Sequence, residues 1–294
     1  PLYRLEAKNK NTSNICSFFL EKSLRLAKYV ALVFPKFLLN TPEFSATRAE
    51  LAQKSVDAIL DFGEKGFPGI LVETIAIFIN NLAAPANTKV FSLTHRLHLT
   101  QPQAYIFDPE LPYWIIYRNQ LFDSVCRKLD FDVFEVFRDR QLTNKLLSSS
   151  GELRVLKSRN LSDDGKTILD IPGYDSYISY AAAKPLSVFQ YLDAPNVYLT
   201  PNMTYKPRMM KKPPHCVVNG SLAILIPKGG IVPTEKQLAY FSSEEYRAFY
   251  QIARNFQTRS LNVDACSVFF YGLLRDEAKP APEKFDASVQ LSFL

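Results

Sequence analysis

The pattern that most constrains the fold lies between residues 15 and 80, where helical and strand-like spacings alternate. Residues 15–28 carry apolar side chains at helical intervals, with Asn14 or Ser13 available as an N-cap. Residues 29–35 are β-branched and aromatic and end in proline, which is typical of a buried strand. The series continues with one predicted helix and then two predicted strands, over 43–54, 56–62 and 70–80.

The order helix, strand, helix, strand, loop, strand predicts the second half of an open α/β sheet closed by an antiparallel hairpin. The hairpin loop, residues 63–69, contains three glycines and one proline. A doubly wound sheet normally opens with a strand and a glycine-rich turn beneath a cofactor, yet the first glycine of this chain is Gly63. We therefore expect the first half of such a sheet to be supplied by other residues.

Three stretches of this region carry a family likeness, namely NICSFFLEKSLRLAKYVALVFPKFLL, RAELAQ and ILDFGEKGFPGILVETIAIFI. They closely resemble the γ-class DNA adenine-N6 methyltransferases from just after their Asn-Pro-Pro-aromatic motif onward, over most of residues 10–80. Residues 198–226 and 242–274 look like parts of the target-recognition domain of the same family. Residues 95–190 can be attached to the family only by their position.

The resemblance implies a domain plan and a fold class. Residues 1–93 would form the C-terminal part of a methyltransferase catalytic domain, the second half of a Rossmann-like sheet with its antiparallel hairpin. Residues 94–275 would form an α+β target-recognition domain that binds DNA, and residues 276–294 a tail. Within the second domain, residues 120–147 predict an acidic amphipathic helix, because Phe131, Phe134 and Phe137 alternate with acidic side chains.

The chain departs from the family in one large way, since it contains neither the Asn-Pro-Pro-aromatic motif nor the glycine-rich S-adenosylmethionine loop. The likeness therefore implies a subunit or fragment of a site-specific, adenine-specific DNA methyltransferase of restriction-modification type, inactive as this chain alone. Its expected partners are double-stranded DNA and a complementary N-terminal half that binds most of the S-adenosylmethionine. The alternative is a non-catalytic subunit that confers DNA-sequence specificity.

Phe67, in the hairpin loop, is the candidate catalytic residue. Adenine N6 is buried in a stacked duplex, so a methyltransferase must extrude the base, and aromatic stacking returns about 1–3 kcal/mol per contact. The family takes one such ring from the hairpin loop, which the resemblance places at Phe67. Gly66 and Gly69 leave backbone room for a ligand, and Pro68 stiffens the chain. Without the resemblance, Phe67 is a loop aromatic tucked against its hairpin.

Two further residues are candidates for the cofactor side of the pocket. Phe19 lies where the family places an aromatic beside the adenine ring of S-adenosylmethionine, although an apolar helix face needs such a residue in any fold. Pro35 ends a predicted strand, where open α/β sheets hold their ligands, and is a candidate pocket wall.

The DNA-binding candidates come from charge distribution rather than from the modest net charge of +6. Residues 194–234 and 246–263 contain no Asp or Glu, and basic side chains free of competing acids suit phosphate contacts. Amide and guanidinium groups suit base edges, although a solvated basic face explains any single residue equally well. The candidates are Asn202, Lys206, Arg208, Lys211, Lys212, Arg254, Asn255, Gln257 and Arg259.

Several other classes are disfavoured by the sequence. No apolar run reaches the roughly 20 residues of a membrane span, and the N-terminal stretch lacks a signal-peptide pattern, so we expect a cytoplasmic protein. The four cysteines are scattered, and His95 and His98 have no third ligand nearby, so no metal site is expected. No nucleophile elbow or phosphate-binding loop is present.

Overall fold

The computed structural model describes residues 8–258 and 262–276, which divide into two compact units. The first unit contains residues 8–123 together with residues 252–258, and the second contains residues 124–251 and 262–276. Residues 252–258 therefore belong to the first unit, although the described segments before and after them in the chain belong to the second.

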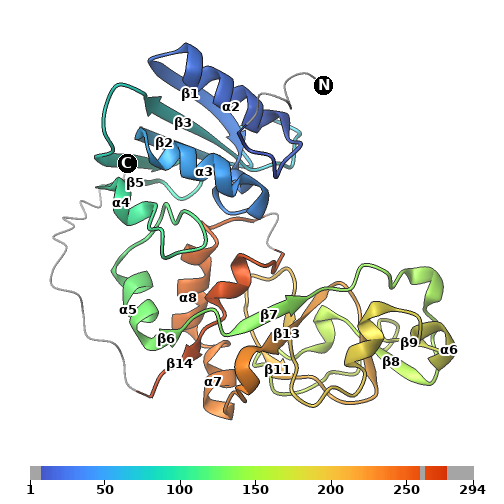
Figure 1. Ribbon diagram of the computed structural model, residues 1–294. Coiled ribbons are helices and arrows are strands. Elements are labelled where there is room, and N and C mark those ends of the chain that lie inside the picture. Colours follow the sequence, from blue (N-terminus) through green and yellow to red (C-terminus); the bar gives the residue numbers. More distant parts are fainter. Residues whose placement is uncertain (1–7, 259–261, 277–294) are drawn as a thin grey trace. The chain divides into compact units, whose positions relative to one another are not determined.

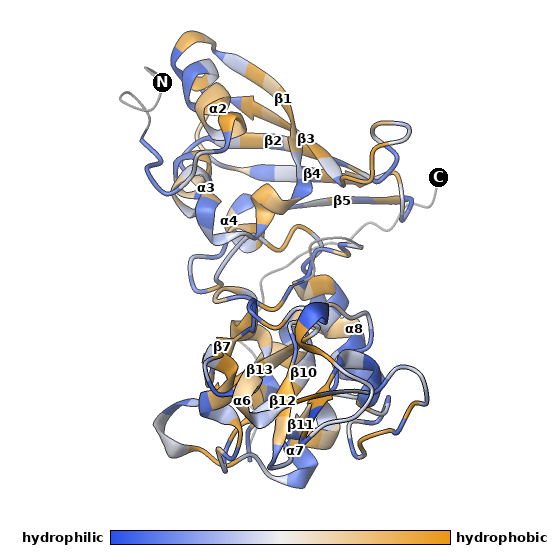
Figure 2. Cartoon of the chain, turned by 90° about the vertical axis from the view of Figure 1, so that its right-hand side faces the viewer, coloured by the Kyte–Doolittle hydropathy of each residue, from blue (hydrophilic) through white to orange (hydrophobic). Residues whose placement is uncertain are grey.

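A five-stranded sheet organises the first unit (Figure 1), with the strand order β1-β3-β2-β4-β5. Strand β3 runs antiparallel to both of its neighbours, and β2 and β4 are parallel. Hydrophobic residues are concentrated along β1 and β3 (Figure 2). The strands are β1 (Tyr29–Pro35), β2 (Ser55–Gly63), β3 (Thr74–Asn80), β4 (Asn87–Ser92) and β5 (Leu97–Pro102).

The first helix of this unit begins where the sequence predicts, and the second begins two residues later than predicted. In α2 (Ile15–Leu26), the side chain of Asn14 accepts a hydrogen bond from the Cys16 backbone N–H at 3.1 Å and so caps the first turn. The buried face of α2 includes Phe18 and Leu20, and the helix contacts β1. Helix α3 (Ser45–Ala52) contacts β2 in the same way, and a short helix, α4 (Gln103–Ile106), follows β5.

Within the described residues, one edge and one face of this sheet are uncovered at β1. Val30 and Phe34 are buried, whereas Tyr29 and Val33 alternate with them and are exposed. Phe78 of β3 stands opposite Ala31 and is 41% exposed, which continues the apolar face onto the next strand. Among the described residues, no strand pairs with the outer edge of β1. A row of free backbone groups beside an uncovered apolar face is the kind of edge that accepts a further strand.

The three strands predicted for this sheet agree closely with β1, β2 and β3, whereas two features differ from the prediction. Strand β3 begins at Thr74 rather than at residue 70, because residues 70–72 form an exposed part of the hairpin loop. The division between the units falls after Asp123 rather than after residue 93, because the β4–β5 hairpin extends the first sheet instead of starting a second domain. The observed fold is a mixed α/β architecture with several sheets.

The second unit is built from three smaller sheets, which have the strand orders β11-β10-β13-β7, β12-β8-β9 and β14-β6. Its strands are β6 (Leu129–Asp130), β7 (Phe134–Phe137), β8 (Leu153–Leu156), β9 (Ser176–Ile178), β10 (Tyr198–Pro201), β11 (Met210–Lys211), β12 (Cys216–Val218), β13 (Leu222–Pro227) and β14 (Leu273–Leu274). Its helices are α5 (Gln120–Lys128), which begins in the first unit, α6 (Tyr180–Ala183), α7 (Glu235–Tyr240) and α8 (Glu244–Ala253), whose last two residues belong to the first unit.

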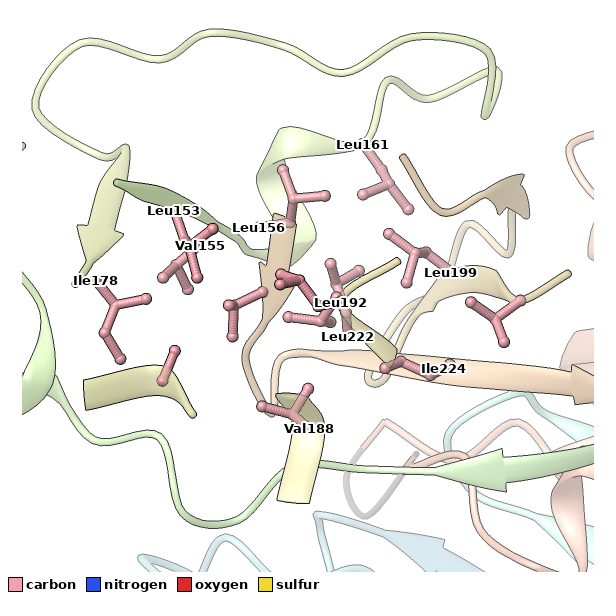
Figure 3. Close-up of a cluster of buried hydrophobic side chains, with 14 residues drawn as sticks. Leu153, Val155, Leu156, Leu161, Ile178, Val188, Leu192, Leu199, Leu222 and Ile224 are labelled. Atoms are coloured by element: carbon pink, nitrogen blue, oxygen red, sulfur yellow. The ribbon is translucent and has the colours of Figure 1, made fainter. Parts of the chain in front are cut away.

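A single aliphatic cluster packs two of these sheets together (Figure 3). Its side chains come from β8, β9 and β12 of one sheet and from β10 and β13 of the other, with Val188 and Leu192 from the segment between β9 and β10. Strand β13 contributes Leu222 and Ile224, which are 0% and 1% exposed. Burying side chains of this size contributes roughly 1.5–3 kcal/mol each before chain entropy is counted, so this cluster is a major source of stability for the second unit.

The long acidic helix expected over residues 120–147 is not formed. Helix α5 ends at Lys128, and Asp132 adopts a left-handed conformation with φ of +59°, which no helix continues through. Phe134 and Phe137 then lie on β7, where they pair with β13, while Phe131 stacks on Phe269. The prediction was therefore wrong beyond Lys128. It rested on the three-residue spacing of Phe131, Phe134 and Phe137, which fits one side of a helix but also occurs in segments that are not helical.

Candidate functional site

The carboxyl ends of three strands of the first unit meet at one edge of its sheet. The first residue of β3, Thr74, pairs with Pro35 at the end of β1 and with Gly63 at the end of β2. Ser92, at the end of β4, pairs with Asp61 of β2. Residues that follow these strands are therefore held close together, at the sheet edge where open α/β folds hold ligands.

A buried ion pair occupies this edge. The Nζ of Lys36 lies 2.7 Å from Oδ2 of Asp61, and both side chains are 1% exposed. The same ammonium lies 3.7 Å from Oε1 of Glu73. The Tyr117 hydroxyl donates to Oδ2 of Asp61 at 2.5 Å, and the Gly63 backbone N–H donates to Oδ1 at 2.9 Å. Three donors thus satisfy the Asp61 carboxylate, as a buried charge requires.

This network fits a structural scaffold better than a proton-transfer pair. Burial, followed by the charge of Asp61, raises the pKa of Tyr117 well above its ordinary value, so that its hydroxyl stays protonated and keeps donating. The Asp61 carboxylate is thus held by three donors of the chain itself. We call Lys36, Asp61, Glu73 and Tyr117 the buried cluster.

The loop between β2 and β3 leaves this cluster and carries Phe67. The Phe67 side chain is 45% exposed, and the apolar residues Ile70 and Leu71 are 53% and 67% exposed. Gly66 packs closely on the start of β3, since a Cβ there would lie 2.2 Å from Oγ1 of Thr74. An exposed aromatic on a loop with firmly held ends is a suitable surface for a planar ligand.

His95 and Phe256 form a second aromatic contact beside the cluster. His95 lies in the turn between β4 and β5, and its ring centroid is 4.7 Å from that of Phe256. Phe256 in turn lies 5.1 Å from the ring of Tyr117. Partial burial, followed by the nearby charge of Lys36, lowers the pKa of His95, which favours a neutral ring. His95 therefore contributes an uncharged aromatic surface to this edge.

The segment that contains Phe256 contradicts part of the expected DNA-binding set. Asn255 is fully buried, and its side chain accepts from the Ile116 N–H at 2.9 Å and donates to the Trp114 carbonyl at 2.8 Å. Gln257 exchanges hydrogen bonds with the amide of Asn40, at 2.5 and 3.5 Å. Arg254 is 2% exposed and donates to the hydroxyl of Tyr113.

Arg254, Asn255 and Gln257 therefore hold the returning chain segment onto the first unit and do not face a DNA surface. Asn255 and Phe256 both have left-handed backbone conformations, with φ of +50° and +51°. Such conformations cost of order 1–3 kcal/mol each in residues other than glycine, so the surrounding hydrogen bonds must hold the segment in place.

Three further DNA-binding candidates are also used inside the fold, in the second unit. The Arg208 guanidinium donates to the backbone carbonyls of Ser158 and Leu161, and burial lowers its pKa. The Lys212 ammonium donates to the Leu192 carbonyl at 2.7 Å, and burial lowers its pKa as well.

Asn202 is 7% exposed, donates to the Gly220 carbonyl and accepts from the Val263 N–H. Buried side chains that satisfy backbone groups cannot also reach a groove, so none of Asn202, Arg208 and Lys212 is kept as a DNA contact.

Lys206 and Lys211 are the DNA-binding candidates with exposed side chains. Lys206 forms an exposed ion pair with Asp163 at 3.1 Å. Lys211 lines a cavity of about 450 Å³ together with Asp164 and Glu235. An acid from another part of the chain therefore pairs with Lys206, and two acids line the same cavity as Lys211, although residues 194–234 contain none. Arg259 lies outside the described residues.

The candidates for the cofactor side differ in exposure. Phe19, on α2, is 60% exposed and presents a ring face to solvent, whereas Pro35 is half-buried at the end of β1. These residues offer one stacking surface and no charged group.

The described ranges, 8–258 and 262–276, contain no group of three His, Cys, Asp or Glu side chains placed to hold a metal ion. Within the same ranges no helix combines the length and apolar character that crossing a bilayer demands.

Of the buried cluster, the sequence singles out only Glu73, a polar residue inside the apolar predicted strand 70–80; Lys36, Asp61, Tyr117 and Phe256 were not identified. Two signals point to them in retrospect. Asp61 is an acid within the apolar strand sequence Ile59–Phe62, and Lys36 directly follows a strand that ends in proline. Tyr117 and Phe256 carry no such signal, because only the fold brings them to this edge.

The chain was compared with protein-family models, with curated proteins and with solved structures, and only the solved structures gave matches. No protein-family model matches the chain, and no curated protein does. One similar solved structure is the type IIL restriction-modification enzyme MmeI in complex with DNA, at 10% identity and a TM-score of 0.46. Another is the type IIG restriction endonuclease BpuSI, at 10% identity and a TM-score of 0.34. The alignments cover 86% and 87% of this chain but only 40% and 41% of those proteins.

Proposed function

We propose that this chain supplies the target-base loop of a site-specific DNA adenine-N6 methyltransferase of restriction-modification type, and that a complementary half supplies most of the S-adenosylmethionine site. The observation that carries the proposal is the exposed ring of Phe67 on a loop that leaves the buried cluster at the carboxyl ends of the strands. A second support is the sequence resemblance of residues 14–79 to the γ-class DNA adenine-N6 methyltransferases, which predicts a base-stacking aromatic at the position of Phe67.

In the proposed reaction, the chain's own part is to hold an extruded adenine in place. The Phe67 ring would stack on one face of the base, and a ring from the complementary half on the other. Stacking of this kind is worth about 1–3 kcal/mol per contact and offsets much of the cost of unstacking the base from the duplex. S-adenosylmethionine, when bound by the complementary half, supplies the methyl group, and Phe19 would lie against its adenine ring.

The open edge of β1 is the proposed attachment point for the complementary half. Strand β1 has seven residues, an outer edge that pairs with no described strand, and an exposed apolar face that includes Tyr29 and Val33. Adding a strand there would satisfy the free backbone groups, and the elements that come with the strand would cover the apolar side chains.

A specificity subunit without catalytic role is the competing function, in which the first unit only docks onto another protein. The test is transfer of labelled methyl from S-adenosylmethionine to unmethylated duplex DNA, by this chain alone and with the polypeptide encoded immediately upstream. The methyltransferase proposal expects transfer only in the mixture. Duplex binding with no transfer in either sample would favour the specificity subunit.

A further inference from the structure

We call the segment between β2 and β3, residues 64–73, the Phe67 loop. Each of its two ends carries a glutamate, and the same distant residue binds both. Glu64 directly follows β2, and Glu73 directly precedes β3. The Oγ1 of Thr258 donates to Oε1 of Glu64 at 2.7 Å. The backbone N–H of Thr258 donates to Oε2 of Glu73 at 3.0 Å. Thr258 thus bridges the entry and the exit of the loop.

Thr258 can act as a fixed point because the residues before it are held on three sides. The amide of Gln257 pairs with that of Asn40, and the side chain of Asn255 binds backbone groups of Trp114 and Ile116. Phe256 packs between the rings of His95 and Tyr117. The segment that presents Thr258 is therefore more firmly anchored than the loop that it binds.

The middle of the loop has weaker support of its own. Its backbone hydrogen bonds join neighbours, Lys65 to Phe62 and Ile70 to Phe67, and its residues from Phe67 to Val72 are exposed. The direction in which Phe67 points therefore depends on how firmly the two ends are held. Glu73 is also held by Lys36, whose backbone N–H donates to the Glu73 carbonyl at 2.8 Å, whereas Glu64 lies on the more exposed side.

We infer that Thr258 is a positioning residue for the Phe67 loop, and that its hydroxyl fixes the orientation of the Phe67 ring through Glu64. The role in catalysis rests on the proposed function, but the effect on the ring does not. Thr258→Val keeps the side-chain shape and the backbone bond to Glu73 and removes the bond to Glu64. Thr258→Ser keeps both bonds.

The test uses a tryptophan in place of Phe67 as a reporter of ring motion. The chain has one tryptophan, Trp114, so the reporter is Phe67→Trp combined with Trp114→Phe. If that background does not fold, Trp114 is kept and its signal, measured in the chain with Phe67, is subtracted. Time-resolved fluorescence anisotropy is then recorded for Thr258→Val, for Thr258→Ser and for the control Thr100→Val, an exposed threonine on β5.

We expect Thr258→Val to lower the residual anisotropy of the reporter tryptophan at least twofold, while Thr258→Ser and Thr100→Val leave it at the parent value. Unchanged anisotropy in Thr258→Val would overturn the inference, whatever the methyl-transfer activity. Lowered anisotropy together with an absence of methyl transfer in every assembled sample would support the positioning role and count against the methyltransferase proposal. In an active assembly, Thr258→Val should lower kcat several-fold with little change in duplex affinity.

Discussion

The ammonium of Lys36 lies 2.7 Å from a carboxylate oxygen of Asp61, and neither side chain reaches solvent to more than 1% of its surface. Lys36 directly follows β1, and Asp61 lies near the end of β2. Their pairing joins the ends of these two strands beside the point from which the Phe67 loop departs. The stability of the first unit and the placement of its candidate site therefore depend on the same buried contact.

Removing one member of this pair should destabilise the chain strongly. We expect Lys36→Met to lower the free energy of unfolding by about 3–5 kcal/mol, because it leaves the Asp61 carboxylate buried without its cation. Urea unfolding followed by circular dichroism measures the change. The control is Lys206→Met, which removes an exposed pair with Asp163 and should cost less than about 1 kcal/mol. Equal losses in the two variants would show that the buried pair has no special role.

Asn255 should behave as a structural residue and not as a DNA contact. Asn255→Ala leaves the Ile116 N–H and the Trp114 carbonyl without partners, at a cost of about 1–3 kcal/mol for each buried group. Duplex affinity, measured by fluorescence polarisation below the unfolding transition, should stay unchanged. The exposed Asn87→Ala is the matched control for stability. A loss of affinity without a loss of stability would restore Asn255 to the DNA interface.

The lowered pKa of His95 predicts a specific pH dependence of stability. Because the folded chain binds this proton less readily than the unfolded chain, His95 contributes stability above its ordinary pKa of 6.5, which is lost as the pH falls toward its folded value. Between pH 7 and pH 5, the native chain should therefore lose more stability than His95→Gln does. Urea midpoints at pH 7, 6 and 5 give the comparison. Parallel profiles for the two proteins would contradict a depressed pKa at His95.

Lys206 and Lys211 are the exposed lysines retained for DNA contact, and their role should appear in the salt dependence of binding. Each phosphate contact contributes about 0.9 to the slope of log K against log salt concentration. Lys206→Gln and Lys211→Gln should each lower that slope by up to this amount, and Lys206 less, because Asp163 already neutralises it. Lys89→Gln, an exposed lysine on β4, serves as control. Unchanged slopes in both variants would remove these lysines from the interface.

Helix α2 and the strands β1, β2 and β3 could be predicted because their signals are local, whereas β4 and β5 were not predicted. Periodicity and capping place α2 and β1 within two residues of their observed ends, since Asn14 and Pro35 act on the residues next to them. The predicted boundary at residue 93 separates β5 from β4, its partner in the first sheet, because sheet membership depends on which strand a segment pairs with. Periodicity carries no information about that partner.

The site was predicted less well than the fold, for a related reason. No acid lies near Lys206 in the sequence, yet Asp163, from another part of the second unit, forms an ion pair with it in the fold. Asn255 and Gln257 have the amide groups that suit base edges, and the same groups suit backbone partners in a buried segment. The residue type determines which kinds of hydrogen bond a side chain can form, but only the fold determines with which partner it forms them.

Phe67 is the residue on which the proposed function depends, and Phe67→Ala tests it most directly. In the assembled enzyme, the initial rate of labelled methyl transfer and the affinity for the same duplex are measured side by side, with the exposed Leu82→Ala as control. Loss of one stacking contact should slow transfer roughly ten- to a hundredfold while duplex affinity changes less than about threefold. Transfer at the native rate, or an equal loss of transfer and affinity, would contradict a base-stacking role for Phe67.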